Sequence, residues 1–323
     1  MYSPPNFTTA LIMTAFSAVF WGSWANTYKG AKKYPFELFY LDYIVGVVLC
    51  SLVFALTLGS HGSSGESFMA NVHAANGMNV VWAMIGGFIF NIANLLLVAG
   101  IAIAGLAIAF PIAIGIAVIE GVVLSYALQP KGSATYLAVG VGLATLAIIF
   151  DAMAYKRLSG GVTVTKKGIV VNVISGLLMG AFAPFVTKSL TTDHALTPYS
   201  VALFFSLGAL VCCFFINPYL MKHPLLGEPV SFSGFFQTSG TNHFLGVLGG
   251  IVWGLGGCFN FVAAGFVGVA ISYAIGQSSP MIAALWGVLV WKEFRGADSK
   301  AWLYLTLMFL SYIAAVISIA KAY

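Results

Sequence analysis

Ten continuous apolar runs, each about 20 residues long, alternate with shorter polar segments along the chain. A helix of that length crosses the hydrocarbon core of a membrane, whereas the strands of a membrane barrel alternate apolar and polar residues. The pattern therefore predicts an all-α integral membrane protein with ten transmembrane helices. The expected spans are 8–27, 36–58, 79–103, 105–127, 133–154, 168–189, 198–220, 243–264, 266–290 and 300–320.

One pair of these spans occurs twice. The stretch Gly86–Ser125 returns in degenerate form as Gly249–Val288, at an offset of 163 residues. Each copy consists of two apolar spans joined by a tight turn that contains glycine, which predicts two helix pairs of common origin. The aligned positions include Gly86 with Gly249, Gly87 with Gly250, Phe90 with Trp253, and Gly105 with Gly268.

The composition supports a membrane protein, and the distribution of charged residues predicts how the chain is oriented in the membrane. Hydrophobic residues make up 60% of the chain and charged residues 7%, whereas soluble domains carry about 25% charged residues. Eleven lysines and arginines fall in loops on one side and three on the other, so the positive-inside rule places both termini outside the inner membrane. Each half has five spans, so the second half enters from the opposite side. We expect two inverted-topology five-helix repeats, 1–160 and 161–323, an architecture of many secondary transporters.

Two carboxylates within the spans are candidates for proton coupling. Glu120 lies about four residues from the centre of the fourth span, where an ionised carboxylate is costly and must be paired, protonated or hydrated. It would load and release a proton, or form a structural hydrogen bond to a neighbouring helix. Asp42 lies near the inner end of the second span, and a structural ion pair with Lys29, Lys32 or Lys33 competes with a transport role. A third carboxylate, Asp151, is expected at the membrane interface.

Neutral polar residues in the repeated spans are candidates for solute binding. Asn91 and Asn94 are three residues apart, so they project from a similar face of the third helix, and Asn260 lies in the eighth span. Amides suit a neutral polyhydroxyl or amide solute, although they also hold membrane helices together. The ninth span is interrupted by Pro280, and broken spans in corresponding halves indicate a transport site. Its candidate contacts are Tyr273, Gln277 and Ser278.

Three tryptophans, Trp21, Trp24 and Trp253, lie within spans rather than only at the interfacial belt. Their rings would stack on a sugar face or a planar base, or serve packing alone. No glycine-rich phosphate loop occurs, and the histidines lie in loops or at the edge of a span, which argues against an intramembrane metal site. We therefore expect neither an enzyme nor a bound cofactor or metal. The excess of lysine and arginine over acidic residues reflects the membrane topology and does not indicate a nucleic-acid partner.

Several motifs resemble known transporter families. The two inverted five-helix repeats resemble the drug/metabolite transporter superfamily. Within it, FWGSW and GGIVWGLGG followed by FVGVAISYAIGQ resemble the glucose/ribose porters, and YKGAKKYPFELF and AIGIAVIEGVVL resemble the rhamnose–proton symporters. FELFYLDY and GGFIFNIAN are similar to plant ureide permeases. The resemblance implies uptake of a small neutral polar solute by alternating access.

The leading expectation is a monosaccharide–proton symporter. An importer of ureides or nucleobases and an exporter of metabolites or drugs remain as alternatives. The expected partners are then a small neutral solute, protons and the lipid bilayer. A homodimer is a possible assembly. The absence of Lys and Arg from the interior of the spans argues against anionic solutes.

Overall fold

The computed structural model describes residues 1–158 and 165–323, and within them all regular secondary structure is helical. Ten helical spans are long and apolar enough to cross a membrane, which confirms the expected fold class. They run over Phe7–Gly30, Phe36–Leu56, Gly77–Ala104, Phe110–Leu128, Ala134–Leu158, Lys166–Thr191, Pro198–Lys222, Gly240–Val267, Val269–Val290 and Ser299–Ala320. The expected boundary between the halves, at 160/161, lies outside the described residues.

Side-chain caps determine where many of these helices begin. Asn76 caps α5 (Gly77–Ala104) through the backbone N–H of Met78, and Ser239 caps α12 (Gly240–Val267) through that of Asn242. Such caps satisfy backbone donors that have no partner inside the helix. Similar caps precede α1 (Phe7–Ser23), α9 (Lys166–Thr191), α10 (Pro198–Lys222) and α15 (Ser299–Ala320).

Three spans are interrupted. The first is interrupted at Trp24, between α1 and the short α2 (Ala25–Gly30). The fourth begins as α6 (Leu106–Ala109) and passes through a wide turn, η1 (Phe110–Ile114), into α7 (Gly115–Leu128). The ninth leaves helical geometry between α13 (Val269–Gly276) and α14 (Ser279–Leu285) and ends in η2 (Trp286–Val290). The linkers after the second and seventh spans contain the short helices α4 (Phe68–Ala74) and α11 (Ser233–Gln237).

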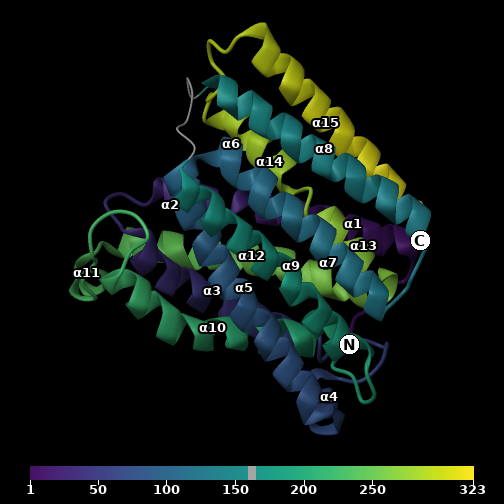
Figure 1. Ribbon diagram of the computed structural model, residues 1–323. Coiled ribbons are helices and arrows are strands. Elements are labelled where there is room, and N and C mark those ends of the chain that lie inside the picture. Colours follow the sequence, from purple (N-terminus) through teal and green to yellow (C-terminus); the bar gives the residue numbers. More distant parts are fainter. Residues whose placement is uncertain (159–164) are drawn as a thin grey trace.

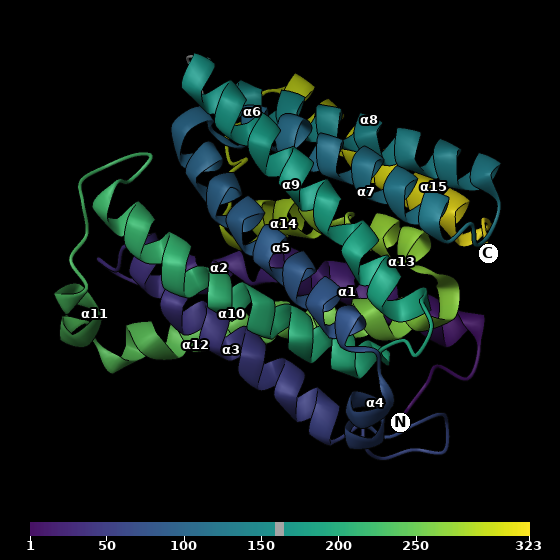
Figure 2. The ribbon, with the colours of Figure 1, turned by 60° about the horizontal axis from the view of Figure 1, so that its bottom comes forward.

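The helices form two groups that meet chiefly where α10 packs against α3 and α12. One group brings α5 against α9 and α10, and the other brings α12 against α1 and α3 (Phe36–Leu56). In Figures 1 and 2, α8 (Ala134–Leu158) lies beside α15 along one edge, and α3 and α10 lie towards the other. The start of α1 lies beside the C-terminal residue, because the rings of Phe7 and Tyr323 stack with 4.7 Å between centroids.

Glycines allow two close helix crossings. A Cβ atom on Gly87 of α5 would overlap the carbonyl oxygen of Phe205 in α10, and one on Gly208 would overlap the carbonyl oxygen of Met84. The two backbones are therefore in direct contact, as small residues permit in membrane helices.

The crossing of α12 and α3 is built in the same way. A Cβ atom on Gly250 would overlap the carbonyl oxygen of Tyr43, and one on Gly46 would overlap that of Val247. Gly87 and Gly250 are both the eleventh residue of 28-residue helices. The turns that follow α5 and α12 also match, because Gly105 and Gly268 have φ angles of 75° and 92°. Only glycine adopts such angles without strain.

Candidate functional site

A cavity of about 440 Å³ lies between the two groups of helices. This volume is within the range of small-molecule sites, roughly 300–1,000 Å³. The cavity reaches inward to Trp253 and Phe205, which are buried, and outward to Lys29 and Glu293, whose side chains are 47% and 30% exposed. It therefore opens at the end that carries the loops after the first and ninth spans, where eleven of the lysines and arginines gather in the predicted topology.

Aromatic rings form the inner end of the cavity. The indoles of Trp21 and Trp253 stack with 5.8 Å between centroids and 19° between planes. Phe90 lies 4.6 Å from Trp253, and Phe182 and Phe205 meet Phe90 at 5.6 and 5.4 Å. This aromatic cluster offers broad apolar ring surfaces to a flat or ring-shaped solute.

Few polar groups face this cavity, and they come from distant parts of the chain. Asn94 of α5 lines the cavity and donates a hydrogen bond of 3.1 Å from its amide to the Tyr40 hydroxyl. Gln277 lies at the break in the ninth span, and Asp151 belongs to α8. The indole N–H of Trp21 has no hydrogen-bond partner. Mostly apolar walls with a few polar groups are typical of sites for small organic solutes.

Polar contacts link the two sides of the cavity mouth. The Lys29 ammonium lies 2.6 Å from the Glu293 carboxylate, and the Tyr155 hydroxyl donates to the same carboxylate at 3.2 Å. The indole N–H of Trp291 donates to the side-chain oxygen of Asn26 at 2.6 Å. The first span is thereby connected to the segment that follows the ninth.

Buried side chains close the opposite end. The Tyr273 hydroxyl donates to the backbone oxygen of Met179 at 3.0 Å, and its ring meets Phe182 edge-on. The Asn260 amide donates to the Ser272 carbonyl and to the Ser17 hydroxyl. All of these polar side chains are buried, so the solvent-exposed residues that line the cavity belong to the Lys29 and Glu293 end.

The structure brings five of the nine predicted solute contacts to the cavity: Trp21, Trp24, Asn94, Trp253 and Gln277. The other four lie in contacts between helices. Asn91 is buried beside Cys212 of α10, and Asn260 and Tyr273 bridge helices as described above. The Ser278 hydroxyl donates to the Ile275 carbonyl within its own helix turn. Their predicted role in solute binding stays a prediction.

Glu120 and Asp42 lie away from the cavity lining. Glu120 of α7 packs against α9, where a Cβ atom on Gly180 would approach its carboxylate to 2.9 Å. One of its oxygens is buried and without a hydrogen-bond partner. Asp42, in the second turn of α3, is held by His243 and Tyr34. The coupling role predicted for both residues remains a prediction.

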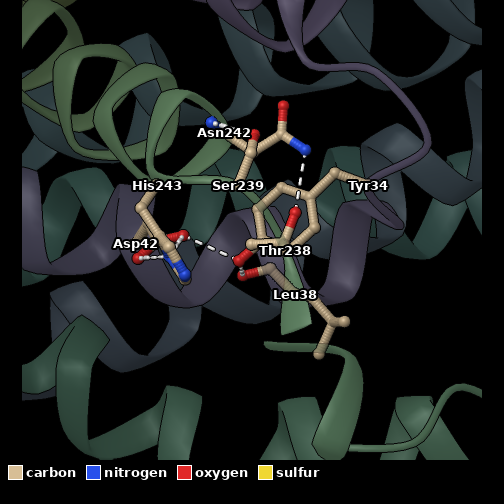
Figure 3. Close-up of polar contacts among 7 residues, drawn as sticks. All are labelled: Tyr34, Leu38, Asp42, Thr238, Ser239, Asn242 and His243. Carbon is tan, nitrogen blue, oxygen red and sulfur yellow. Dashed lines mark hydrogen bonds and ion pairs between the residues drawn. The ribbon is translucent and has the colours of Figure 1, made fainter. Parts of the chain in front are cut away.

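The partner expected for Asp42 is corrected by the structure. Asp42 does not pair with a lysine of the first loop but with His243, whose Nδ1 lies 2.9 and 3.0 Å from the two carboxylate oxygens (Figure 3). The Tyr34 hydroxyl donates to the same carboxylate at 2.8 Å. The expected partners were lysines close to Asp42 in the sequence. His243 is 201 residues away and reaches Asp42 only because α3 crosses α12.

Sequence reasoning missed two polar members of the site. Asp151 was expected at the membrane interface, yet it is 1% exposed and lines the cavity together with Tyr155. Asp151 and Tyr155 are four residues apart, which puts both on one face of the helix. This spacing is the sequence feature from which their shared position could have been predicted. Among the described residues, no group of three or more His, Cys, Asp or Glu side chains is placed to hold a metal ion.

The chain is similar to characterised and solved proteins over most of its length. It is 24% identical over 339 residues to "Ureide permease 1" of Arabidopsis thaliana, covering 86% of this chain and 87% of the relative. It is 22% identical over 254 residues to "Putative sugar uptake protein lmo0424" of Listeria monocytogenes, covering 78% and 80%. A solved crystal structure shares the fold, with a TM-score of 0.68 at 15% identity over 96% of this chain and 97% of the other.

The sequence model of the ureide permease family matches residues 39–164 and 162–321. These ranges include the helices that carry Asn94, Asp151, Trp253 and Gln277, and they take in both halves of the molecule. Permeases transport solutes across membranes, which agrees with ten apolar spans and a cavity that is lined by residues of the first nine and open at one end. The chain therefore belongs to the ureide permease family and is a multi-pass membrane transporter of small solutes.

Proposed function

We propose that this protein imports a small, planar, neutral ureide or oxo-nucleobase by alternating access. The observation that supports this proposal most directly is the stacked pair of Trp21 and Trp253 at the inner end of the cavity. The amides of Asn94 and Gln277 lie on the cavity wall. Indole faces stack on flat conjugated rings. Amide side chains offer the donor and acceptor pairs that complement the N–H and C=O groups of a ureide. The names of several relatives, ureide permeases of Arabidopsis thaliana, support the same class.

A monosaccharide, the leading expectation from the sequence, is the second candidate. The relative named as a putative sugar uptake protein favours it. Tryptophan faces also stack on the C–H face of a sugar, but a sugar presents hydroxyls around its whole rim. A flat conjugated ring leaves its two faces to the indoles and needs polar partners only in its own plane, which suits the few polar groups of this cavity better.

Alternating access rests on the duplication, which we infer to be an inverted repeat. The same glycine-to-carbonyl crossing occurs between α5 and α10 and between α12 and α3. The contact of Phe90 with Trp253 joins equivalent positions, so a pseudo-twofold axis would pass between these rings. Rocking of one repeat against the other would close the mouth at Lys29 and open the end sealed by Tyr273.

Uptake would be driven by protons across the inner membrane, with both termini outside. In this arrangement the cavity faces the cytoplasm. The described chain places carboxylates on or near the solute path but no lysine or arginine at the inner aromatic end of the cavity. That charge pattern suits a neutral solute carried with a proton better than an anion.

Uptake assays test the proposal. Cells that lack their own carriers and express this chain should accumulate labelled allantoin or uracil, and excess unlabelled glucose or rhamnose should leave that uptake unchanged. The Trp253→Ala variant should reduce uptake strongly, whereas Trp302→Ala, on the exposed side of α15, should not. Uptake of a labelled sugar without competition from ureides would overturn the ureide assignment in favour of the second candidate.

A further inference from the structure

The fifth transmembrane helix, α8, lies at the edge of the molecule (Figure 1), yet one part of it reaches the cavity. Asp151 and Tyr155 are one helical turn apart, and both line the cavity. The remainder of that helix packs chiefly against α15. One turn of α8 therefore supplies acidic and phenolic groups to a cavity that is otherwise mostly apolar.

The Asp151 carboxylate is buried without a counter-charge. Its side chain is 1% exposed, its Oδ1 has no hydrogen-bond partner, and among the described residues no cation forms an ion pair with it. The cation on the cavity, Lys29, is held by Glu293 at 2.6 Å. An ionised carboxylate at this depth is costly without a partner, so a proton is the smallest ligand that satisfies the site.

The titratable groups around Asp151 form a path to the surface. Tyr155 comes from the same helix, Tyr312 from α15, and Glu293 from the segment after η2. Tyr155 donates to Glu293, whose side chain is 30% exposed at the cavity mouth. A proton that leaves Asp151 to the cavity would pass Tyr155 and Glu293 on its way to water and would not cross the aromatic inner end.

We propose that Asp151 carries the transported proton and, in its protonated form, donates a hydrogen bond to the solute. This inference rests on the proposed function and deepens it. The proton enters with the solute, stays on the carboxyl group while the cavity changes sides, and leaves to water past Glu293 once the solute has gone. The empty carrier then returns with this carboxylate ionised, and it is protonated again from outside before the next solute binds.

The other two carboxylates near the path are less suited to this role. Asp42 is already held by His243 and Tyr34, and Glu120 faces α9 rather than the cavity. They are measured as rivals to Asp151, because each is a carboxylate within a transmembrane span whose amide variant removes the same charge.

Reconstituted vesicles provide the test, with Asp151→Asn, Glu120→Gln and Asp42→Asn measured beside the wild type. Two readouts are needed: solute counterflow without a proton gradient, and accumulation driven by a pH difference of one unit. One proton per solute allows about tenfold accumulation per pH unit. We expect Asp151→Asn to retain counterflow but to lose accumulation, falling from about tenfold to about onefold. Asp151→Glu should restore part of the accumulation, and the two rival variants, Glu120→Gln and Asp42→Asn, should accumulate the solute.

Accumulation by Asp151→Asn at the wild-type level would overturn the proposal, as would its loss in Glu120→Gln alone. If the wild type showed no counterflow of ureides or nucleobases, the proposed function would fail by itself. Tryptophan fluorescence tests Asp151 independently, because Trp21 and Trp253 line the same cavity. A pH-dependent change that disappears only in Asp151→Asn supports proton binding at this residue, and a change that persists in that variant contradicts it.

Discussion

Phe90 and Trp253 face each other with 4.6 Å between their ring centroids, and each is the fourteenth residue of a 28-residue helix. The two helices, α5 and α12, are the aligned copies of the repeated stretch. Equivalent positions of the two copies therefore meet at the inner end of the cavity. One copy contributes a phenyl ring and the other an indole, so the two halves share the packing but differ in what they offer a solute.

Replacement of Trp253 by alanine should weaken solute binding. Stacking of an aromatic ring on a base contributes about 1–3 kcal/mol, so we expect the KM to rise by about five- to 150-fold. Trp253→Phe, which installs the ring found at the equivalent position 90, should keep most of the affinity. The KM for uptake and the ligand-induced rise in melting temperature measure both variants. Equal losses in Trp253→Ala and Trp253→Phe would contradict a stacking role.

The two asparagines of α5 should separate binding from packing. Asn94 lines the cavity, so Asn94→Ala should raise the KM about fivefold, the value of one neutral hydrogen bond of about 1 kcal/mol. Asn91 is fully buried and both of its amide atoms lack partners. Asn91→Leu should therefore leave the KM unchanged and keep or raise the melting temperature. A raised KM in Asn91→Leu with none in Asn94→Ala would reverse this assignment.

The two glycine crossings should be equally intolerant of a methyl group. A Cβ atom at Gly87 or Gly250 would overlap a backbone carbonyl, which cannot move aside as a side chain can. Overpacking of this kind costs typically about 1–3 kcal/mol, so each alanine variant should melt several degrees lower in detergent. Gly142 of α8 has no atom within 4 Å of such a position. Gly142→Ala is the control and should melt at the wild-type temperature or higher.

The contact of Tyr34 with Asp42 should make stability depend on pH in the alkaline range. Burial, followed by the hydrogen bond to Asp42, holds the pKa of the Tyr34 phenol above its ordinary value. A folded-state pKa above the unfolded one contributes stability below about pH 10, and that contribution is lost as the pH rises through the folded value. The wild type should therefore melt above Tyr34→Phe at pH 7–9, and the difference should shrink above pH 10. A difference that widened above pH 10 would contradict the assignment.

Cysteine labelling should establish the orientation. All four native cysteines are buried, so an impermeant maleimide should leave the wild type unlabelled. Ser64→Cys, in the exposed loop before α4, should react in intact cells. Ser231→Cys, in the exposed loop before α11, should react only after permeabilisation. The reverse pattern would place both termini inside and turn the cavity towards the exterior.

Much of the fold could be predicted from the sequence. Apolar run length defined the ten spans within a few residues, because a helix must cover the hydrocarbon thickness whatever its neighbours are. Pro280 and the neighbouring polar residues indicated the interruption of the ninth span. The matched glycines indicated the turns at Gly105 and Gly268, since their positive φ angles favour that residue type.

Tertiary structure decided which of the polar residues within the spans reach the cavity. Glu120 and Asp151 both lie in apolar helices, and the sequence ranks them only by depth along the span. The direction in which each side chain points depends on which distant helices pack around it. The pairing of Asp42 with His243 has the same cause. The sequence by itself determined the spans and the residues suited to a solute site, and only the packing of helices far apart in the chain determined which of these residues come together.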